Sequence, residues 1–268
     1  MSANISLGQF LPGDSVVHRL DPRTKILLMV VYIIVVFMVK TLPVFLLPAL
    51  LLVAIFAFAQ VPATYFFSAL KPMKWLLVFM FVINIFATQG KTVWFEWKFI
   101  RLTQEAFEQA VFITLRLVLL VAGTSILTLT TSPIALTDGL EKLMAPLRKL
   151  RFPAHELAMM MTIALRFIPT LLEETDRIQK AQMARGADFE SGNIFQRAKS
   201  MIPVLVPLFV SAFRRADELA MAMESRCYHG GEGRTRMLEL HFHARDLIAS
   251  LAMLAVLAGI VLLERLPL

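Results

Sequence analysis

Long apolar runs constrain this chain more than any other feature of its sequence. They cluster in residues 26–131 and 247–263, and hydrophobic residues make up 57% of the 268 positions. The mean hydropathy is +0.68, well above that of an ordinary soluble domain. A helix needs about 20 consecutive apolar residues to cross the hydrocarbon core of a bilayer. The runs therefore predict an all-α integral membrane protein.

Five membrane spans are predicted from these runs. They are Lys25–Lys40, Leu42–Gln60, Trp75–Gln89, Phe107–Thr131 and Asp246–Leu263. The cations Arg19, Arg23 and Lys25 precede the first span and predict a cytosolic N-terminus, because basic loops tend to stay on the cytosolic side. Residues 90–104 then lie outside, and their alternation of apolar and polar side chains predicts a short hairpin at the membrane interface.

The segment between the fourth and fifth spans has a different pattern. Residues 137–245 carry 16 of the 27 Lys and Arg residues together with 13 of the 20 acidic residues. Apolar side chains recur there at helical spacing, so we expect three amphipathic helices at about Leu136–Leu150, Pro153–Arg185 and Ile194–Cys227. The apolar stretch Met201–Phe213 contains two prolines and is too short to span a bilayer. We interpret it as lying against the membrane or against another membrane protein.

These patterns predict about five transmembrane helices plus a cytosolic domain of long amphipathic helices. The expected organisation is a four-span membrane domain (1–135), the cytosolic domain (136–245) and a C-terminal transmembrane helix (246–268). The formal net charge is +7, but no basic stripe with interleaved aromatic residues is present, so we expect no nucleic-acid partner. The excess of cations suits cytosolic loops beside the anionic headgroups of a lipid bilayer.

The most specific feature is a repeated triplet in which an Arg lies between small residues. The two copies are Ala184-Arg185-Gly186 and Ser225-Arg226-Cys227, and their Arg residues are 41 positions apart. In each copy an Asp precedes the Arg by nine residues, Asp176 in the first and Asp217 in the second. Each triplet ends a predicted helix, because Gly186 and the glycine-containing run from Tyr228 to Gly231 suit C-terminal caps.

Two interpretations of the triplets remain open from the residues alone. A cation in the last turn stabilises a helix through its dipole, so each Arg can be a simple cap. A helix that ends just after an Arg also presents a charged fork at its tip, and small neighbours let that tip enter a groove on another protein. Repetition of the triplet at a matched offset favours the second interpretation.

Arg116 is the one charge well inside a predicted span. Such charges usually face a bundle interior or an aqueous cavity. We expect a structural role, by pairing with Glu105 or Glu108 or by snorkelling, in preference to a substrate site. A stand-alone secondary transporter or channel would have to coordinate its substrate with Asn84, Arg116 and the hydroxyl-rich end of the fourth span.

Motifs for catalysis or metal binding are weak in this chain. Gly90-Lys91-Thr92 lacks the earlier Gly of a phosphate-binding loop. Glu173 and Glu174 with Arg177 resemble the motif of intramembrane proteases of prenylated proteins, but the Arg is displaced by one residue and the motif lies in a charged helix. The best metal candidates lack further ligands: Cys227 with His229, and His241 with His243. We therefore expect no catalytic residues and no metal or cofactor site.

Several short motifs complete the pattern. They are Leu20-Asp21-Pro22-Arg23-Thr24-Lys25 before the first span, Thr131-Ser132-Pro133 with Leu136-Thr137 after the fourth, Leu165-Arg166-Phe167-Ile168-Pro169 in the second amphipathic helix, and the two Arg triplets. With these motifs the chain resembles the transmembrane T component (EcfT, CbiQ-like) of energy-coupling factor (ECF) transporters over nearly its whole length. The Arg triplets with their helices carry this resemblance most specifically.

The resemblance implies an energy-coupling scaffold without catalytic activity of its own. In this family the helix tips dock onto two ABC-type ATPase subunits, expected here as a heterodimer, which bind ATP and Mg. A separate substrate-binding membrane subunit (S subunit), one or several interchangeable ones, would hold the vitamin or metal ion. The implied coupling residues are Ala184, Arg185, Gly186, Ser225, Arg226 and Cys227, with helix support from Asp176 and Asp217. The implied location is the bacterial cytoplasmic membrane.

Overall fold

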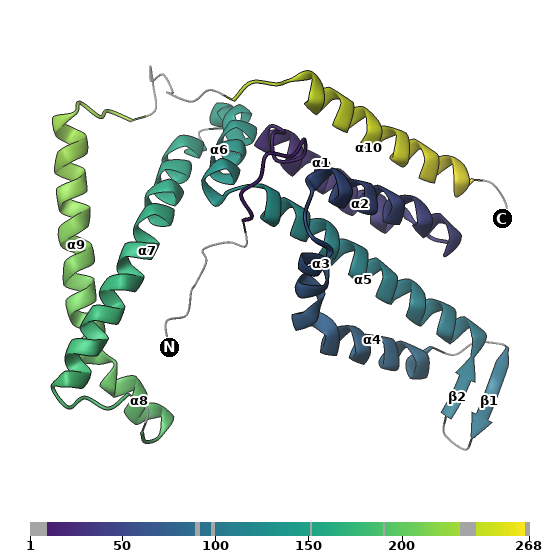
Figure 1. The fold of residues 1–268 in the computed structure, drawn as a ribbon, viewed down its shortest axis with the longest axis horizontal. Helices are drawn as coiled ribbons and strands as arrows, with labels where there is room; N and C mark the ends of the chain where they lie inside the picture. The colour runs from purple at the N-terminus through teal and green to yellow at the C-terminus, as the bar shows by residue number, and fades with distance from the viewer. Residues whose placement is uncertain are drawn as a thin grey trace. The chain divides into compact units, whose positions relative to one another are not determined.

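The chain is helical throughout most of its length. The computed structural model describes residues 10–88, 92–97, 100–150, 152–189, 191–230 and 240–265. In this part of the chain there are ten α-helices, three short 3-10 helices and one two-stranded sheet (Figure 1). The elements fall into two compact units, residues 1–142 with 239–268 and residues 143–238. The prediction of an all-α architecture is confirmed, with a hairpin as its only sheet in the residues described.

The first unit is a bundle of helices with a small hairpin. Its helices are α1 (Pro22–Met38), α2 (Leu46–Ala59), α3 (Ala63–Leu70), α4 (Lys74–Ala87), α5 (Gln104–Thr130), most of α6 (Pro133–Met144) and α10 (Ala244–Leu263). Short 3-10 turns at Pro43–Phe45 and Lys71–Met73 precede α2 and α4. Strands β1 (Val93–Trp97) and β2 (Ile100–Thr103) pair antiparallel, so the predicted hairpin is confirmed.

Helix α5 is the centre of this bundle, since it packs against α1, α2, α3 and α4. Tyr32 and Val36 of α1 share a buried core with Leu119 and Ile126 of α5. Gly123 lets the two helices approach closely, because a Cβ atom at this position would lie 2.2 Å from Tyr32 Cε1. The Tyr32 hydroxyl donates to Leu119 O at 3.1 Å, which satisfies its polar group inside the core.

The start of α1 has the cap that its sequence predicts. Asp21 precedes the helix and accepts from Arg23 N at 2.9 Å, and Pro22 occupies the first helical position. The buried Lys25 ammonium donates to His18 O at 3.0 Å and to Thr130 O at 2.9 Å. These two hydrogen bonds tie the start of α1 to the end of α5.

Arg116 has a structural role. Its Nη2 donates to Val39 O at 2.7 Å, the carbonyl of the residue that ends α1. The guanidinium carbon lies 4.6 Å from the ring centre of Phe112 and 5.5 Å from that of Phe37. Arg116 therefore closes the C-terminal end of α1 between two aromatic rings.

Five stretches of the described residues are long and apolar enough to cross a membrane: Ala63–Ala87, Gln104–Thr130, Ala154–Ala184, Ile194–Ser225 and Ala244–Leu263. The first of these joins α3, a 3-10 turn and α4, so the predicted start of the third span at Trp75 was too late. Lys71, Pro72 and Lys74 interrupt the apolar run in the sequence, whereas the chain stays helical through them. The predicted first two spans correspond to α1, with 17 residues, and to the shorter apolar stretch Pro43–Ala59.

The second unit contains the second and third of the helices predicted as amphipathic, whereas the first, Leu136–Leu150, begins as α6 in the first unit and ends in a 3-10 turn of the second. They are α7 (Ala154–Ala184), α8 (Ile194–Ser200) and α9 (Ile202–Ser225), preceded by a 3-10 turn at Ala145–Leu150. The two candidate spans that contain these helices, Ala154–Ala184 and Ile194–Ser225, are less apolar than the other three. Their mean hydropathy is 1.2, compared with 1.7 to 2.5. The predicted third amphipathic helix is divided at Met201, because Pro203 has no N–H to continue the hydrogen bonding of α8.

Candidate functional site

The tip of α7 closes with a Schellman arrangement. Gly186 N donates to Met183 O at 2.9 Å, and Ala187 N donates to Gln182 O at 3.0 Å. Gly186 has φ of +89°, in the left-handed region that a residue without a Cβ atom adopts at low cost. Arg185 is the residue just before this turn, so its side chain stands at the end of the helix.

The tip of α9 repeats this arrangement with a different residue at the turn. Cys227 N donates to Glu224 O at 2.9 Å, and Tyr228 N donates to Met223 O at 3.0 Å. Cys227 has φ of +56° and takes the left-handed position that a glycine has in α7. The prediction of a glycine cap in the run from Tyr228 to Gly231 was wrong, because the chain already turns at Cys227; Gly231 itself lies outside the described residues.

The six residues of the two triplets are all exposed. Neither the Arg185 nor the Arg226 guanidinium forms a hydrogen bond or ion pair with a side chain or carbonyl of the described residues. Each guanidinium has five N–H donors in a fixed planar fork. The two helix tips therefore present charged donors that a partner protein can bind.

Helices α7 and α9 pack against each other. Glu174 of α7 accepts from Arg215 Nη2 of α9 at 2.6 Å, and both side chains are partly buried. Further toward the end of α7, Gln182 Nε2 donates to Pro203 O near the start of α9 at 3.4 Å. The later residue of α7 thus contacts the earlier residue of α9, so the two helices run in opposite directions (Figure 1).

Glu174 and Arg215 are equivalent positions of the repeat, since they are separated by the same 41 residues as the two triplet arginines. Arg185 follows Glu174 by 11 residues, and Arg226 follows Arg215 by 11 residues. At 1.5 Å per residue, each tip is roughly 16 Å from the ion pair along its own helix. Because the helices are antiparallel, the tips point away from the ion pair in opposite directions.

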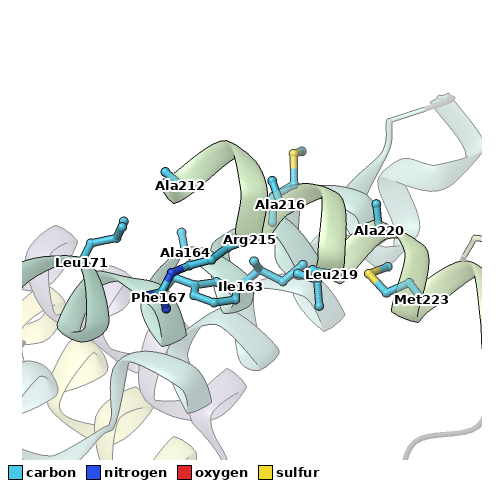
Figure 2. Close-up of a pocket in the computed structure, with 11 residues that line it drawn as sticks. Ile163, Ala164, Phe167, Leu171, Ala212, Arg215, Ala216, Leu219, Ala220 and Met223 are labelled. Carbon is cyan, nitrogen blue, oxygen red and sulfur yellow. The ribbon is translucent and has the colours of Figure 1, made fainter. Parts of the chain in front are cut away.

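An apolar groove of about 390 Å³ lies between α7 and α9. Figure 2 shows Ile163 and Phe167 of α7 facing Arg215 and Leu219 of α9 across it. The groove is also lined by small side chains from both helices, Ala164, Ala212, Ala216 and Ala220. Small residues at such positions allow the two helix backbones to approach closely.

The two Asp residues predicted as helix support are both exposed. Asp176 Oδ2 accepts from Lys180 Nζ at 3.0 Å, one helical turn away on α7. Such an exposed pair contributes only a few tenths of a kcal/mol. For Asp217 the structure gives no ion pair with any of the residues that it describes.

The alternatives considered from the sequence find little support in the geometry. Asn84 Nδ2 donates to Met80 O at 2.7 Å, and the hydroxyls of Thr124, Ser125 and Thr130 donate to carbonyls of their own helix. Each of these polar groups therefore already has a hydrogen-bond partner on its own helix. Among the residues described, no three His, Cys, Asp or Glu side chains gather as they would around a metal ion. Gly90 and Lys91 of the weak phosphate-loop motif lie outside those residues.

The Glu174–Arg215 pair is the part of the site that sequence reasoning missed. Glu174 had been compared only with a protease motif, together with Glu173 and Arg177. The signal was present in the sequence, because a shift of 41 residues from Glu174 reaches a residue of opposite charge. What the sequence did not reveal is that equivalent positions of the two helices meet in space.

Comparison with known proteins is consistent with this geometry. Residues 13–237 match the CbiQ family, described as a cobalt transport protein. A Clostridium kluyveri protein called energy-coupling factor transporter transmembrane protein EcfT is 54% identical over 266 residues, which is 99% of this chain and 98% of that protein. EcfT proteins of Thermosediminibacter oceani and Bacillus subtilis are 53% and 47% identical, over 92% and 96% of this chain and 93% and 98% of their own lengths.

Proposed function

This chain belongs to the CbiQ family and is a transmembrane T component of the ECF type, and from this premise we propose that it couples ATP hydrolysis to substrate uptake. In this proposal it is the scaffold subunit of an ABC-type importer for a vitamin or a metal ion. Two ABC-type ATPase subunits, a heterodimer, bind ATP and Mg and hydrolyse the nucleotide. The chain itself is non-catalytic and holds no cofactor.

The arrangement of the two arginine tips is the observation that carries this proposal. Arg185 and Arg226 each end a long helix in the same hydrogen-bonded turn, and each is exposed. Docking onto a single site of one partner protein would need only one such tip. Two like tips at opposite ends of a helix pair suit docking into one groove on each of two related ATPase subunits.

The proposed mechanism uses the helix pair as a mechanical link. Closure of the ATPases on ATP changes the distance between their grooves and moves the two tips relative to each other. The Glu174–Arg215 ion pair and the small residues around it hold the helices together at their crossing. Movement at the tips is therefore transmitted along α7 and α9 to the surface that contacts the substrate-binding subunit.

A stripe of exposed apolar side chains on α9 is our candidate for that contact. Val206, Phe209, Val210 and Phe213 recur at helical spacing and are 55% to 68% exposed. Such a face is unfavourable in water and suits the membrane or the S subunit, in line with the interpretation of Met201–Phe213 from the sequence. One S subunit or several interchangeable ones would use it.

The proposed placement follows the same organisation. Residues 1–135 and 246–268 lie in the bacterial cytoplasmic membrane with the N-terminus in the cytosol, and residues 136–245 form the coupling domain on the cytosolic side. Helices α7 and α9 are then coupling helices, despite an apolar content that would also allow a span. Cysteine accessibility on each face of intact cells would test this placement.

The direct test is co-purification of the tagged chain from its native membrane, as wild type and as the double variant Arg185→Ala with Arg226→Ala. Loss of a charged hydrogen bond buried at an interface costs about 2–5 kcal/mol, so the double variant should lose its ATPases. Arg177→Ala with Arg214→Ala is the matched control, because both side chains are exposed on the same helices but away from the tips. Equal recovery of ATPases with both double variants would refute the proposal.

The competing function is a stand-alone secondary transporter or channel. It requires substrate uptake by the purified chain alone in liposomes, without ATPase subunits. Uptake that persists in the Arg185→Ala, Arg226→Ala variant would establish that function in place of energy coupling.

A further inference from the structure

A second cavity lies inside the membrane-helix bundle, separate from the coupling helices. Its volume is about 470 Å³, within the range of about 300–1,000 Å³ that is common for small-molecule sites. It is surrounded by α1, α2, α5 and α10 and by the residues before α1. Its walls are apolar almost throughout, for example Leu28, Leu52, Ile126, Ala249 and Met253.

The cavity extends along the bundle for about two helical turns. On α1 it is lined from Lys25 to Tyr32, a rise of roughly 10 Å. Tyr32 and Met253 mark its deep end, where both side chains belong to the buried core. Phe58 of α2 and Ile248 of α10 also line it but are 66% and 65% exposed, so the cavity opens onto the outer apolar surface of the bundle.

The polar groups of the cavity gather at the end opposite Tyr32. Lys25, Thr130 and Arg245 line this end, which lies at the starts of α1 and α10 and at the end of α5. The Lys25 ammonium has three donors and gives two of them to His18 O and Thr130 O. Arg245 is exposed, and its guanidinium forms no ion pair with a residue that the structure describes.

The balance of charge at this end is positive, because three cations, Arg23, Lys25 and Arg245, lie near two buried carboxylates, and the carboxylate of Asp21 is 3.8 Å from Arg23 Nε. Asp246 is buried beside Lys25 and accepts from the backbone N–H groups of Asp21 at 2.8 Å and His243 at 2.9 Å. Its carboxylate therefore offsets the Lys25 charge and already has partners. Arg245 remains as an uncompensated cation beside an apolar cavity that opens toward lipid.

We propose that this cavity holds one acyl chain of an anionic phospholipid, with the lipid phosphate bound at Arg245. The apolar walls suit a hydrocarbon chain, and a cationic rim between membrane helices suits an anionic headgroup. The lateral opening past Phe58 and Ile248 lets the rest of the lipid stay in the bilayer. A lipid held there would fill the space between α1, α2, α5 and α10 and fix their separation.

Native mass spectrometry of the purified full-length chain in detergent would test this site. The probe is phosphatidylglycerol, with phosphatidylcholine of the same acyl chains as the neutral competitor and glycerol phosphate as the headgroup without chains. We expect one phosphatidylglycerol to be retained in preference to phosphatidylcholine, and glycerol phosphate not to be retained. Equal retention of the two lipids, or binding of glycerol phosphate alone, would overturn the proposal.

Two pairs of variants make the test specific. Arg245→Gln should weaken phosphatidylglycerol binding about fivefold, whereas Arg265→Gln at the other end of α10 should not. Ala249→Phe fills the cavity and should abolish retention, whereas Ala255→Phe, outside the cavity on the same helix, should not. If Ala249→Phe does not fold, the comparison of Arg245→Gln with Arg265→Gln decides. Equal phosphatidylglycerol binding by these two variants refutes the site. Loss of the lipid from the wild-type chain in the assembled transporter would show that a partner subunit occupies the cavity instead.

Discussion

Glu174 and Arg215 form a 2.6 Å ion pair between equivalent positions of two repeated helices. The pair is partly exposed, with 23% and 36% of the two side-chain surfaces accessible. Its net contribution to stability is therefore modest, at most about 1 kcal/mol for a pair of this kind. Its position matters more than its strength, because it joins α7 to α9 at the same number of residues from each arginine tip.

Reversing one charge of this pair should loosen the crossing. We expect Arg215→Glu to lower the thermal unfolding temperature and to reduce ATP-driven uptake, since two carboxylates would then face each other. The double variant Glu174→Arg with Arg215→Glu should recover most of the lost unfolding temperature and most of the lost uptake. The measurement is a double-mutant cycle on unfolding in detergent. A swap no better than the worse single variant would show that the pair does not set the crossing.

Replacing Cys227 by Gly should stabilise the end of α9. The residue has φ of +56°, where a side chain with a Cβ atom costs about 1–2 kcal/mol relative to glycine. We expect Cys227→Gly to raise the unfolding free energy by about 1 kcal/mol, seen as slower hydrogen exchange at the helix end. Gly186→Ala should have the opposite effect on α7, because φ there is +89° although no atom lies within 4 Å of an added Cβ. Equal exchange in all variants would contradict the left-handed turns.

Gly123→Ala should destabilise the membrane bundle. The added methyl group would lie 2.2 Å from Tyr32 Cε1, so α1 and α5 would have to separate at a cost of about 1–3 kcal/mol. Gly259→Ala is the matched control, since its Cβ atom would lie 3.6 Å from Leu47 Cδ1, an ordinary contact. Thermal unfolding should separate the two variants, and the additional change Tyr32→Leu should recover part of the loss in Gly123→Ala. Similar unfolding temperatures for both glycine variants would rule out close packing at Gly123.

Arg116→Leu should weaken the end of α1 without changing which substrate is transported. The change removes the 2.7 Å hydrogen bond to Val39 O, worth about 1.5–3 kcal/mol for a charged donor. Arg116→Lys should lose less stability than Arg116→Leu, because it keeps the positive charge beside Phe112. It should still lose some, because Lys lacks the planar guanidinium fork. The measurements are unfolding temperature and substrate competition in the assembled transporter. An altered substrate preference at unchanged stability would make Arg116 a substrate-site residue after all.

The long helices of the second unit were the most predictable part of the fold. Helical spacing of apolar residues and the prolines between helices predicted both ends of α7 and the end of α9 within two residues, whereas the predicted start at Ile194 is that of α8. The triplets marked both helix tips, and Gly186 was recognised as a cap from its identity alone. Local signals of this kind act within a few residues along the chain, which is why the sequence reveals them.

Features that depend on distant contacts were less predictable. The first half of the third membrane stretch was missed because Lys71, Pro72 and Lys74 break its apolar run, whereas the folded chain places Lys71 and Pro72 in a 3-10 turn and begins α4 at Lys74. Cys227 takes a conformation that its own preference opposes, so packing and hydrogen bonding around the helix end decide it. The bond from Arg116 to Val39 joins residues on two helices, and no local pattern indicates it.

The antiparallel crossing at equivalent repeat positions also limits the shape of any partner. A rotation of 180° about an axis near the Glu174–Arg215 pair exchanges α7 with α9 and carries one arginine tip onto the other. A partner that receives both tips in a similar manner must have an approximate two-fold axis, as a closed dimer of two similar subunits has and a head-to-tail chain of subunits lacks. The repeat within one polypeptide thus matches the symmetry of a two-subunit partner without a second copy of this chain.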